Sequence, residues 1–514
     1  MSAWWRGVLA AICLTVVEVV GRFTLGTPLV PEWMAQQLFA WVPIGLFEFF
    51  VTRLGTAAKW LAFAGMITLH WAIGGLLGWA MGRFHPPGTS RIARYAGWSL
   101  VLTLLWLCVF WPLVRIHPLG PAALGPSAVP AWLAFFAYAI LFTLAYAALE
   151  MPPRSAAPLA AGGVERRPSL SAGRSADLGR RRFLFSAGSA LLIAALWSWR
   201  GVAKAAADID AIVRRILGGM RGVAPEITPT SAFYKVSKNL FDPRVPVETW
   251  RLHIDGEVEH PAALSYDELT ALGSVKLHTT MCCISNWVGG DLIGTALWEG
   301  IPLAELLRRA GLKEGVLDVR LEAYDGYADS IPLRKALDPA TLVVWKMNDE
   351  PLPWDHGAPV RLIVPGIYGM KSVKWLTRIT PVAHDFLGYW ETRGWSDSAV
   401  VKTLSRIDVP SDGAVVGPAP IDVAGIAFGG DRGISKVEVS FDDGATWRPA
   451  ALTEPLSPYT WVHWFYRWRP AKPGRYSIAV RAYDGLGVMQ TGSMVPPAPD
   501  GASGWHRIRV TYRG

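Results

Sequence analysis

Five apolar stretches of membrane-spanning length fill the first 150 residues and restrict what this part of the chain can fold into. Each is close to the ~20 residues that a helix needs to cross a bilayer. Inside lipid, only a helix satisfies its backbone hydrogen bonds within one continuous segment. The sequence therefore predicts an N-terminal helical membrane bundle, a five-helix segment over residues 1–150, with spans at 7–30, 36–52, 58–82, 95–114 and 131–150.

The positive charge of the chain is concentrated in the same region. Residues 1–200 contain 16 Lys and Arg against 6 Asp and Glu, whereas the remainder of the 514 residues is nearly neutral. Because this surplus lies between apolar stretches, it indicates membrane topology and disfavours a nucleic-acid surface. Arginines at 83–94 and 154–182 mark the cytoplasmic side, which places the N-terminus outside. Arg53 and Lys59 do not fit this assignment.

Residues 151–182 are rich in Ala, Pro, Gly, Ser and Arg and predict a disordered cytoplasmic linker. The linker ends in Arg180-Arg181-Arg182, and the apolar run at 183–200 then resembles a twin-arginine export signal. A sixth membrane helix is the alternative. Both interpretations place the rest of the chain on the extracytoplasmic side of the cell's inner membrane. Ala203-Lys204-Ala205 resembles a cleavage site, so whether the signal-like helix is cleaved after about Ala205 stays open.

Two further domains follow. Residues 205–398 mix short strands with amphipathic helices and predict an α+β domain, with strands at 250–254, 317–323 and 360–364 and a helix at 302–310 capped by Gly311. Residues 399–514 alternate with period two and contain Asp-Gly turns, which predicts a β-sandwich. Its Trp-rich stretch at 460–468 is expected in the core in preference to an interface.

The stretch Thr280-Met281-Cys282-Cys283-Ile284-Ser285-Asn286 places two thiols side by side. The other two cysteines, Cys13 and Cys108, lie in the apolar N-terminal stretches. Taken alone, such a pair is more often two buried apolar thiols than a metal site. Downstream basic residues favour a soft thiolate ligand whose metal also carries an anionic organic cofactor.

Cys283-Ile284-Ser285-Asn286 resembles the Cys-Ala-Gly-Asn motif of the sulfite oxidase family of molybdenum enzymes, in which that cysteine binds the metal. The resemblance implies that Cys283 is the molybdenum ligand and Cys282 only its neighbour. It also implies a molybdenum–molybdopterin cofactor. The C-terminal domain resembles the immunoglobulin-like domain of the same family, which commonly makes a dimer contact.

A second set of residues reproduces the order and spacing of the family's pterin site. Asp355-His356-Gly357 is followed by Arg361, Pro365-Gly366 and Ser372-Val373-Lys374-Trp375. The resemblance implies that Arg361 and Lys374 hold the terminal phosphate, while Ser372, Val373 and His356 supply hydrogen bonds. Further contacts implied by the resemblance are Phe233, Tyr234, Lys238, Asn239 and Asp325.

The substrate side departs from the family pattern. Ser237 and Trp395 stand where animal sulfite oxidases place an Arg and a Tyr, although Arg393 keeps its counterpart. Arg393 and Trp395 are therefore the substrate-side catalytic candidates. A hydroxyl cannot replace the charge of a fixed guanidinium in anion recognition, which puts sulfite itself in doubt.

We therefore expect a membrane-associated molybdenum oxidoreductase that transfers an oxygen atom to or from a small oxyanion such as sulfite. One alternative is an S-oxide or N-oxide reductase of the same family, and another is a non-catalytic assembly or transport protein with a binding module of this fold. No haem or iron–sulfur motif is present in the sequence. Electrons are then exchanged with an external partner, cytochrome c or a quinone-linked protein.

Overall fold

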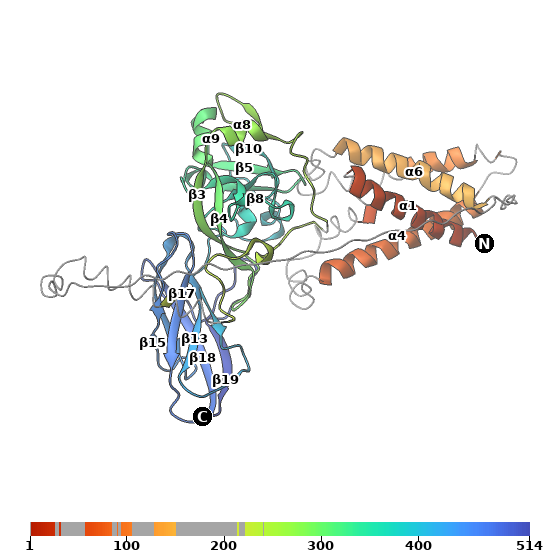
Figure 1. Cartoon of the computed structure of the whole chain (residues 1–514). Helices are drawn as coiled ribbons and strands as arrows, with labels where there is room; N and C mark the ends of the chain where they lie inside the picture. Colours follow the sequence, from red (N-terminus) through yellow and green to blue (C-terminus); the bar gives the residue numbers. More distant parts are fainter. Residues whose placement is uncertain are drawn as a thin grey trace, which may run out of the picture.

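The structure is a computed structural model that describes residues 2–25, 30–31, 57–84, 90, 94–104, 128–150, 213–214, 221–239 and 241–514. Figure 1 shows a helical N-terminal unit, a mixed α+β unit and a β-rich C-terminal unit. Four features expected from the sequence lie outside the described residues: the span at 36–52, the linker at 151–182, the signal-like run at 183–200 and the cleavage motif.

The N-terminal unit contains α1 (Ala3–Leu25), α4 (Ala57–Arg83), α6 (Ala128–Glu150) and a helical segment at 94–104. Within the described residues, α1 and α4 are long and apolar enough to cross a membrane by length and composition. The apolar described part of α6, Ala137–Glu150, is shorter.

Helices α1 and α4 pack antiparallel through small residues. Gly74, Gly78 and Gly82 recur every four residues on α4 and face the first turns of α1. A Cβ atom added to Gly78 would lie 2.6 Å from the Cα of Gly7, so only glycine allows this approach. Such small-residue seams are typical of paired helices in membranes.

Charged side chains mark one end of this helical unit. Glu150 at the end of α6 pairs with Arg94 at 2.6 Å and with Arg6 at 3.6 Å. Ala3 also lies beside Gly82, near the end of α4. The start of α1 and the end of α4 thus share one end of the unit. The expectation that the N-terminus lies on the opposite side from Arg83 is wrong, because α1 and α4 run antiparallel.

The other end of α4 contacts the α+β unit. The rings of Trp60 and Phe63 meet Phe241 edge to face, with centroids 5.9 and 5.8 Å apart. Phe241 belongs to the segment that leads into the first strand of the α+β unit, so the helical unit touches that unit directly.

Two sheets form the α+β unit. One has the order β2 (Ala262–Ser265), β1 (Arg251–Ile254), β10 (Leu376–Val382), β5 (Asp318–Ala323) and β6 (Ala328–Pro332). The other has the order β3 (Val275–Cys282), β4 (Ile293–Pro302), β7 (Leu342–Met347) and β8 (Glu350–Pro351), and β9 (Arg361–Ile363) also pairs with β7. The helices are α8 (Tyr266–Ala271), α9 (Leu303–Ala310) and α10 (Leu333–Ala336).

Helix α9 shows how the sequence pattern becomes packing. It buries Leu303, Leu306, Leu307 and Ala310, the spacing of one helical face, in the core that both sheets share. Gly311 ends the helix at a φ of 69°. The expected strands at 250–254, 317–323 and 360–364 correspond to β1, β5 and β9, so the α+β prediction is confirmed.

The C-terminal unit is a sandwich of two sheets. One has the order β11 (Leu404–Val409), β13 (Ile421–Phe428), β17 (Val462–Trp468) and β16 (Ala451–Leu452). The other has the order β12 (Val415–Val416), β19 (His506–Tyr512), β18 (Gly474–Asp484), β14 (Ile434–Ser440) and β15 (Arg448–Pro449). Both sheets contribute to one core, and Trp464 is fully buried in it. The core assignment of the Trp-rich stretch is therefore confirmed.

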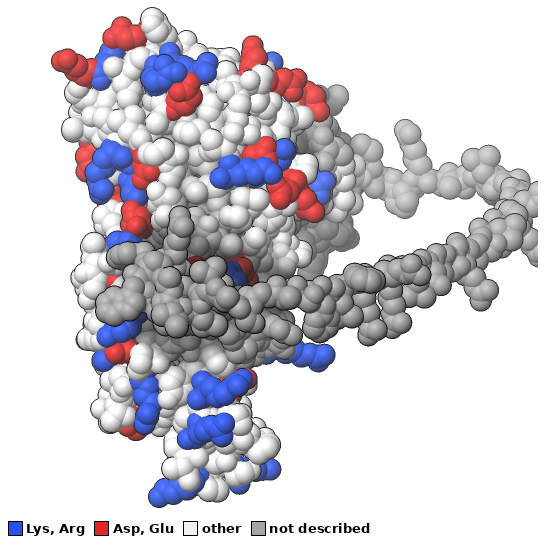
Figure 2. Space-filling model, turned by 60° about the vertical axis from the view of Figure 1, so that its left-hand side comes forward, with Lys and Arg blue, Asp and Glu red and all other residues white. Residues whose placement is uncertain are grey.

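The α+β unit and the sandwich meet along β3. The backbone N–H of Thr280 donates to the carbonyl of Tyr459 at 3.0 Å, and its hydroxyl accepts from the N–H of Trp461 at 2.8 Å. His463 Nε2 lies 2.7 Å from the carbonyl of Ala224. The segment around Ala224, expected within the α+β domain, thus packs on the sandwich. On the side of the molecule that Figure 2 shows, acidic and basic residues are mixed in small groups over the upper part of the surface.

Candidate functional site

The candidate metal ligand Cys283 begins the loop that joins β3 to β4. Cys282 pairs with Ile293 in the ladder, and the N–H of Cys283 donates to the carbonyl of Leu292 at 2.9 Å. Asn286 closes the loop, because its side-chain oxygen accepts from the N–H of Leu292 at 2.9 Å. The motif residues Cys283 and Asn286 therefore fix the loop that carries the thiol.

The two adjacent thiols have different surroundings. Met281 packs with Phe233 in one core cluster, whereas Cys282 packs toward the sandwich in another. Consecutive strand residues point to opposite faces, so Cys283 is expected on the Met281 side. Its Sγ lies 3.0 Å from Ser285 Oγ, and burial raises the pKa of the Cys283 thiol.

The aromatic pair at 233–234 lies on this same side. The Phe233 ring stacks on Tyr234 at 5.3 Å and meets His356 edge to face at 5.7 Å. Burial, and then the nearby Cys283 and Cys282, raise the pKa of Tyr234, while Arg361 opposes the shift. Tyr234 thus lies between the Cys283 loop and the segment that carries Arg361, as a residue lining the cofactor would.

Arg361 in β9 connects two of the motif segments. Its guanidinium donates to the carbonyl of His356 at 2.9 Å and to the carbonyl of Ser372 at 3.1 Å, and it lies 5.3 Å from the centre of the Trp298 ring. Burial lowers its pKa to about 10. Two of its donor groups are thus committed to the backbone, and only Nε is buried without a hydrogen-bond partner among the described residues.

His356 is buried and neutral. Its Nε2 lies 3.2 Å from the carbonyl of Thr230. Burial and the neighbouring Arg361 lower its pKa to about 4. At neutral pH, His356 therefore presents an uncharged imidazole.

The segment Ser372-Val373-Lys374 lies beside the His356 turn. Ser372 Oγ accepts from the N–H of Val364 at 3.1 Å, and Lys374 Nζ donates to the carbonyl of Asp355 at 3.1 Å. Gly357, at a φ of 113°, allows the close approach, because an added Cβ would lie 2.9 Å from the Cβ of Lys374. The glycine of the Asp-His-Gly motif thus brings the two segments together.

Lys238, Asn239 and Asp325 form one hydrogen-bonded group. Asn239 Nδ2 donates to Asp325 Oδ2 at 2.7 Å, and Lys238 Nζ donates to the carbonyl of Asp325 at 3.0 Å. The structure thus brings together residues that are 86 positions apart in the sequence. These contacts orient Lys238 but also use part of its hydrogen-bonding capacity.

On the substrate side, Trp395 and Arg393 take different positions. Trp395 is buried in the cluster that contains Cys282 and Ile284, next to the Cys283 loop. The guanidinium of Arg393 lies 3.6 Å from the centre of the Tyr389 ring. Ser237 Oγ accepts from the N–H of Asn239 at 3.1 Å.

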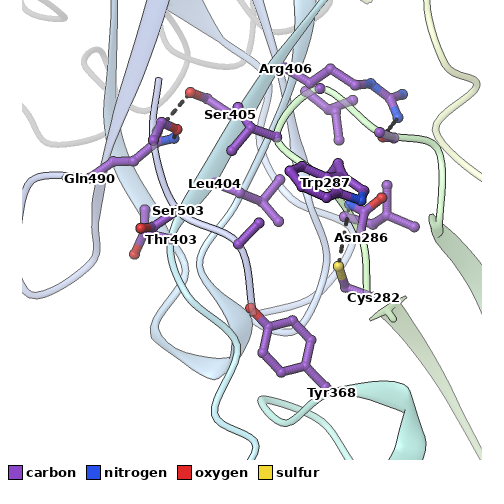
Figure 3. A pocket seen from close by; sticks show the side chains of 17 residues that line it. Cys282, Asn286, Trp287, Tyr368, Thr403, Leu404, Ser405, Arg406, Gln490 and Ser503 are labelled. Carbon is purple, nitrogen blue, oxygen red and sulfur yellow. Dashed lines mark hydrogen bonds between the residues drawn. The ribbon is translucent and has the colours of Figure 1, made fainter. Parts of the chain in front are cut away.

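Sequence reasoning missed a small cavity on the Cys282 side, at the junction with the sandwich (Figure 3). It measures about 20 Å³, room for one or two waters, and Cys282, Trp287, Tyr368 and Gln490 line it. Arg406 from β11 closes one side and donates to the carbonyl of Gly290 at 2.8 Å. No motif signalled Arg406, because its role depends on contact between two domains.

These residues fit an anionic pterin cofactor. The buried, unpartnered Nε of Arg361 is a donor that requires an acceptor, and such atoms are rare in proteins. Lys238 and Lys374 add positive charge with side chains only 9% and 14% exposed. A thiol at Cys283 adds a soft donor suited to molybdenum. The donor set therefore matches a metal held by a sulfur ligand and an anionic organic group.

Comparison with known proteins identifies the family. The description "Oxidoreductase molybdopterin binding domain" applies to the family model that matches residues 240–390, and "Mo-co oxidoreductase dimerisation domain" to the one that matches residues 396–512. The sulfite oxidase of Gallus gallus is 31% identical over 320 residues, which cover 52% of this chain and 69% of the relative. The chain belongs to the sulfite oxidase family.

Other relatives align over a smaller share of their own length. Mitochondrial sulfite oxidase of Homo sapiens is 31% identical over 336 residues, which cover 55% of this chain and 61% of that protein. The NADH nitrate reductase of Volvox carteri is 30% identical, over 46% of this chain and 34% of the relative. This chain thus spans about 61% of the length of the mammalian relatives that it matches.

A solved structure agrees in fold. The sulfane dehydrogenase SoxCD of Paracoccus pantotrophus matches with a TM-score of 0.50 and 22% identity, over 56% of this chain and 81% of that one. The expected sulfite oxidase family and its molybdenum–molybdopterin cofactor are confirmed. The individual site residues and the domain boundaries stay predictions, as does the immunoglobulin-like classification of the sandwich.

Proposed function

We propose that this chain is a membrane-associated molybdopterin-dependent oxidoreductase that transfers an oxygen atom to or from a small substrate such as sulfite. The observation that carries the proposal is the position of Cys283. It begins a loop whose neighbours include Tyr234, which in turn lies close to Arg361. A sulfur ligand thus lies next to the segments suited to an anionic pterin.

The cofactor, when bound, supplies a metal that changes its oxidation state by two electrons as an oxygen atom is transferred. The residues of the chain hold and orient it. Cys283 provides the thiolate, while Lys238, Lys374 and the free Nε of Arg361 neutralise and fix the anionic group. Trp395 belongs to the same buried cluster as Ile284 and helps to exclude water from the Cys283 loop.

A multi-pass location in the inner membrane is supported by the helical unit. Apolar side chains that are more than half exposed, including Val16, Trp60, Leu76 and Leu144, suit contact with lipid. Arg6, Arg83 and Arg94 lie toward one end of the unit, which the positive-inside rule assigns to the cytoplasm. The end near Phe241 then faces outward, which agrees with an extracytoplasmic catalytic domain. In this proposal the N-terminus is cytoplasmic.

A neutral S-oxide or N-oxide is the second candidate substrate class. Ser237 and Trp395 stand where an oxyanion site of the family pattern has an Arg and a Tyr, and Trp395 is only 8% exposed. An apolar, weakly charged site suits a neutral oxide better than a doubly charged anion. The C-terminal domain favours a homodimer. Electrons are exchanged with an external partner, which is cytochrome c or a quinone-linked protein.

The test compares two neighbouring thiols. Cys283→Ala is expected to lower turnover by more than about 100-fold, since even outer-shell partners of a metal are worth about 10- to 100-fold. Cys282→Ala, the matched control, is expected to keep both metal and turnover. Turnover is measured with sulfite and cytochrome c, and with a sulfoxide and a reduced dye.

Molybdenum content per chain is measured on the same full-length samples. Full turnover in Cys283→Ala contradicts the proposal. Wild-type protein without molybdenum after cofactor-replete expression supports the non-catalytic binding module instead.

A further inference from the structure

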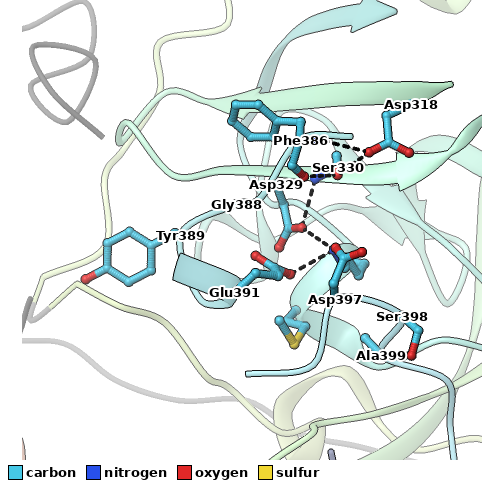
Figure 4. Close-up of polar contacts among 12 residues, drawn as sticks. Asp318, Asp329, Ser330, Phe386, Gly388, Tyr389, Glu391, Asp397, Ser398 and Ala399 are labelled. Atoms are coloured by element: carbon cyan, nitrogen blue, oxygen red, sulfur yellow. Dashed lines mark hydrogen bonds and ion pairs between the residues drawn. The ribbon is translucent and has the colours of Figure 1, made fainter. Parts of the chain in front are cut away.

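A single buried lysine lies among three carboxylates beside the cofactor segments. Lys371 Nζ lies 2.8 Å from Glu391 Oε1, 2.9 Å from Asp329 Oδ1 and 3.0 Å from Asp397 Oδ1. Figure 4 shows the side chains of Asp329, Glu391 and Asp397 close together. The side chains of Lys371, Asp329 and Glu391 are at most 2% exposed, whereas that of Asp397 is 46% exposed. We call these four residues the Lys371 cluster.

The charges of the Lys371 cluster do not balance. One ammonium faces three carboxyl groups, and two ionised carboxylates buried around one cation are costly. Burial and the neighbouring Asp329 raise the pKa of Glu391 to about 8, and burial also raises the pKa of Asp329. Glu391 Oε2 is buried without a hydrogen-bond partner among the described residues. Glu391 therefore exchanges its proton at a pH of about 8, and above that pH its carboxylate can accept one.

The cluster adjoins the cofactor segments on both sides. Lys371 directly precedes Ser372, and the backbone of Gly369 in the same 3-10 turn packs against Tyr234 Oη and the carbonyl of Cys282. The Tyr327 hydroxyl donates to Asp329 Oδ2 at 2.6 Å, and the Tyr327 N–H donates to Asp325 at 3.0 Å.

The other end of the cluster opens to solvent. Asp397 is half-exposed, and its charge also acts on the surface residue Asp385. Lys371 bridges Asp397 to the two buried carboxyl groups. A path of short contacts thus leads from the interior to water.

We propose that Glu391 of the Lys371 cluster accepts a proton that is released during turnover, and that the cluster passes this proton to solvent through Asp397. This inference rests on the proposed function. When sulfite becomes sulfate, water supplies the oxygen atom, sulfur loses two electrons, one to each of two molecules of an external one-electron acceptor protein, and two protons are released. A buried group that exchanges protons with solvent serves this step. These residues handle protons and do not contact the substrate.

The charged and titratable groups that face Glu391 are Lys371 and Asp329, which act on its pKa directly. Tyr327 donates to Asp329, and Asp397 contacts Lys371. Arg393 lies on the same 3-10 turn as Glu391, while Asp385 and Asp318 lie near Asp397. The matched variant Glu391→Gln keeps the shape of the side chain but cannot exchange a proton.

The first experiment needs no bound cofactor. Infrared difference spectra of the full-length protein are recorded between pH 6 and pH 10, about two pH units on either side of the pKa of Glu391. They should show a protonated carboxyl signal that titrates near pH 8. The signal should be absent in Glu391→Gln and present in Glu322→Gln, a partly exposed control on β5. A signal unchanged in Glu391→Gln overturns the inference.

The second experiment measures the pH dependence of turnover with the molybdenum-loaded protein. Wild-type turnover should rise as pH increases through about 8, as Glu391 loses its proton. Glu391→Gln should lose this rise and be slower by about tenfold or more at high pH, and Asp397→Asn should also be slower. If Glu391→Gln fails to fold, Asp397→Asn on the surface still tests the path.

Superimposable profiles for Asp397→Asn and wild type overturn the path to solvent. A wild-type protein that lacks molybdenum refutes the proposed function instead. The infrared experiment then still tests whether Glu391 exchanges a proton.

Discussion

Replacing Arg361 by Met should destabilise the catalytic domain by about 2–4 kcal/mol. Two hydrogen bonds from its charged guanidinium to the carbonyls of His356 and Ser372 contribute about 1.5–3 kcal/mol each. The Trp298 ring adds about 1–2 kcal/mol. Burial opposes these gains, because a pKa lowered to about 10 from 12.5 corresponds to about 3 kcal/mol. Arg361→Met removes all three contributions and leaves two buried carbonyls unpaired.

The assay is the thermal unfolding of the full-length protein in detergent, followed by near-UV circular dichroism. For a domain of this size, 1 kcal/mol shifts Tm by about 2–4 °C, so a decrease of about 4–16 °C is expected. Arg378→Met is the matched control, because Arg378 is 42% exposed and its pairing with Asp255 should be worth less than about 1 kcal/mol. An unchanged Tm in Arg361→Met would refute the role of Arg361 in joining the two segments.

Two further predictions follow from the same structure. His356 has a folded-state pKa of about 4, so its contribution to stability is full above about pH 6.5 and is lost as pH falls toward 4. The free energy of unfolding of the wild type should therefore be about 2 kcal/mol lower at pH 5 than at pH 8. His356→Gln should lose less, as measured by Tm at each pH. The combination of Ala3→Cys and Gly82→Cys should form a disulfide on oxidation, seen as a gel shift. A Cβ at Gly82 would lie 2.6 Å from that of Ala3, so a separation of the two helices by about 1 Å brings the Cβ atoms to the ~3.8 Å of a disulfide. Ala3→Cys with Ala57→Cys, at the far end of α4, should not, and the reverse result would contradict the antiparallel packing.

Local patterns predicted much of the fold. The period of Leu303, Leu306, Leu307 and Ala310 gave α9, and alternation gave the sandwich strands, because each depends on residues close in sequence. The direction of α1 relative to α4 was not predictable from charge alone. It depends on which small residues face each other across the helices, as Gly7 and Gly78 do.

The candidate site divides in the same way. Cys283, His356 and Lys374 were found because motif residues stand at fixed spacings within short segments. Arg406 and the Lys371 cluster were missed, because their partners come from distant segments. Arg406 contacts a loop 116 residues away, and Lys371 on its 3-10 turn contacts Asp329 on β6. The commitment of Arg361 to two carbonyls was also invisible in the sequence, since a motif does not show how many donors remain free.

The edge-to-face contact of Phe241 with Trp60 and Phe63 has a consequence for how a redox partner arrives. Asp242, the next residue, lies 3.8 Å from Lys374, so in the proposed membrane arrangement the segment that carries Lys374 and the rim of the bilayer belong to one continuous surface. A carrier dissolved in the lipid would reach that rim by lateral diffusion, while a water-soluble carrier would be confined to the flanks that the bilayer leaves open. In the proposed arrangement, anchorage in the membrane thus selects among electron carriers before any chemical recognition takes place.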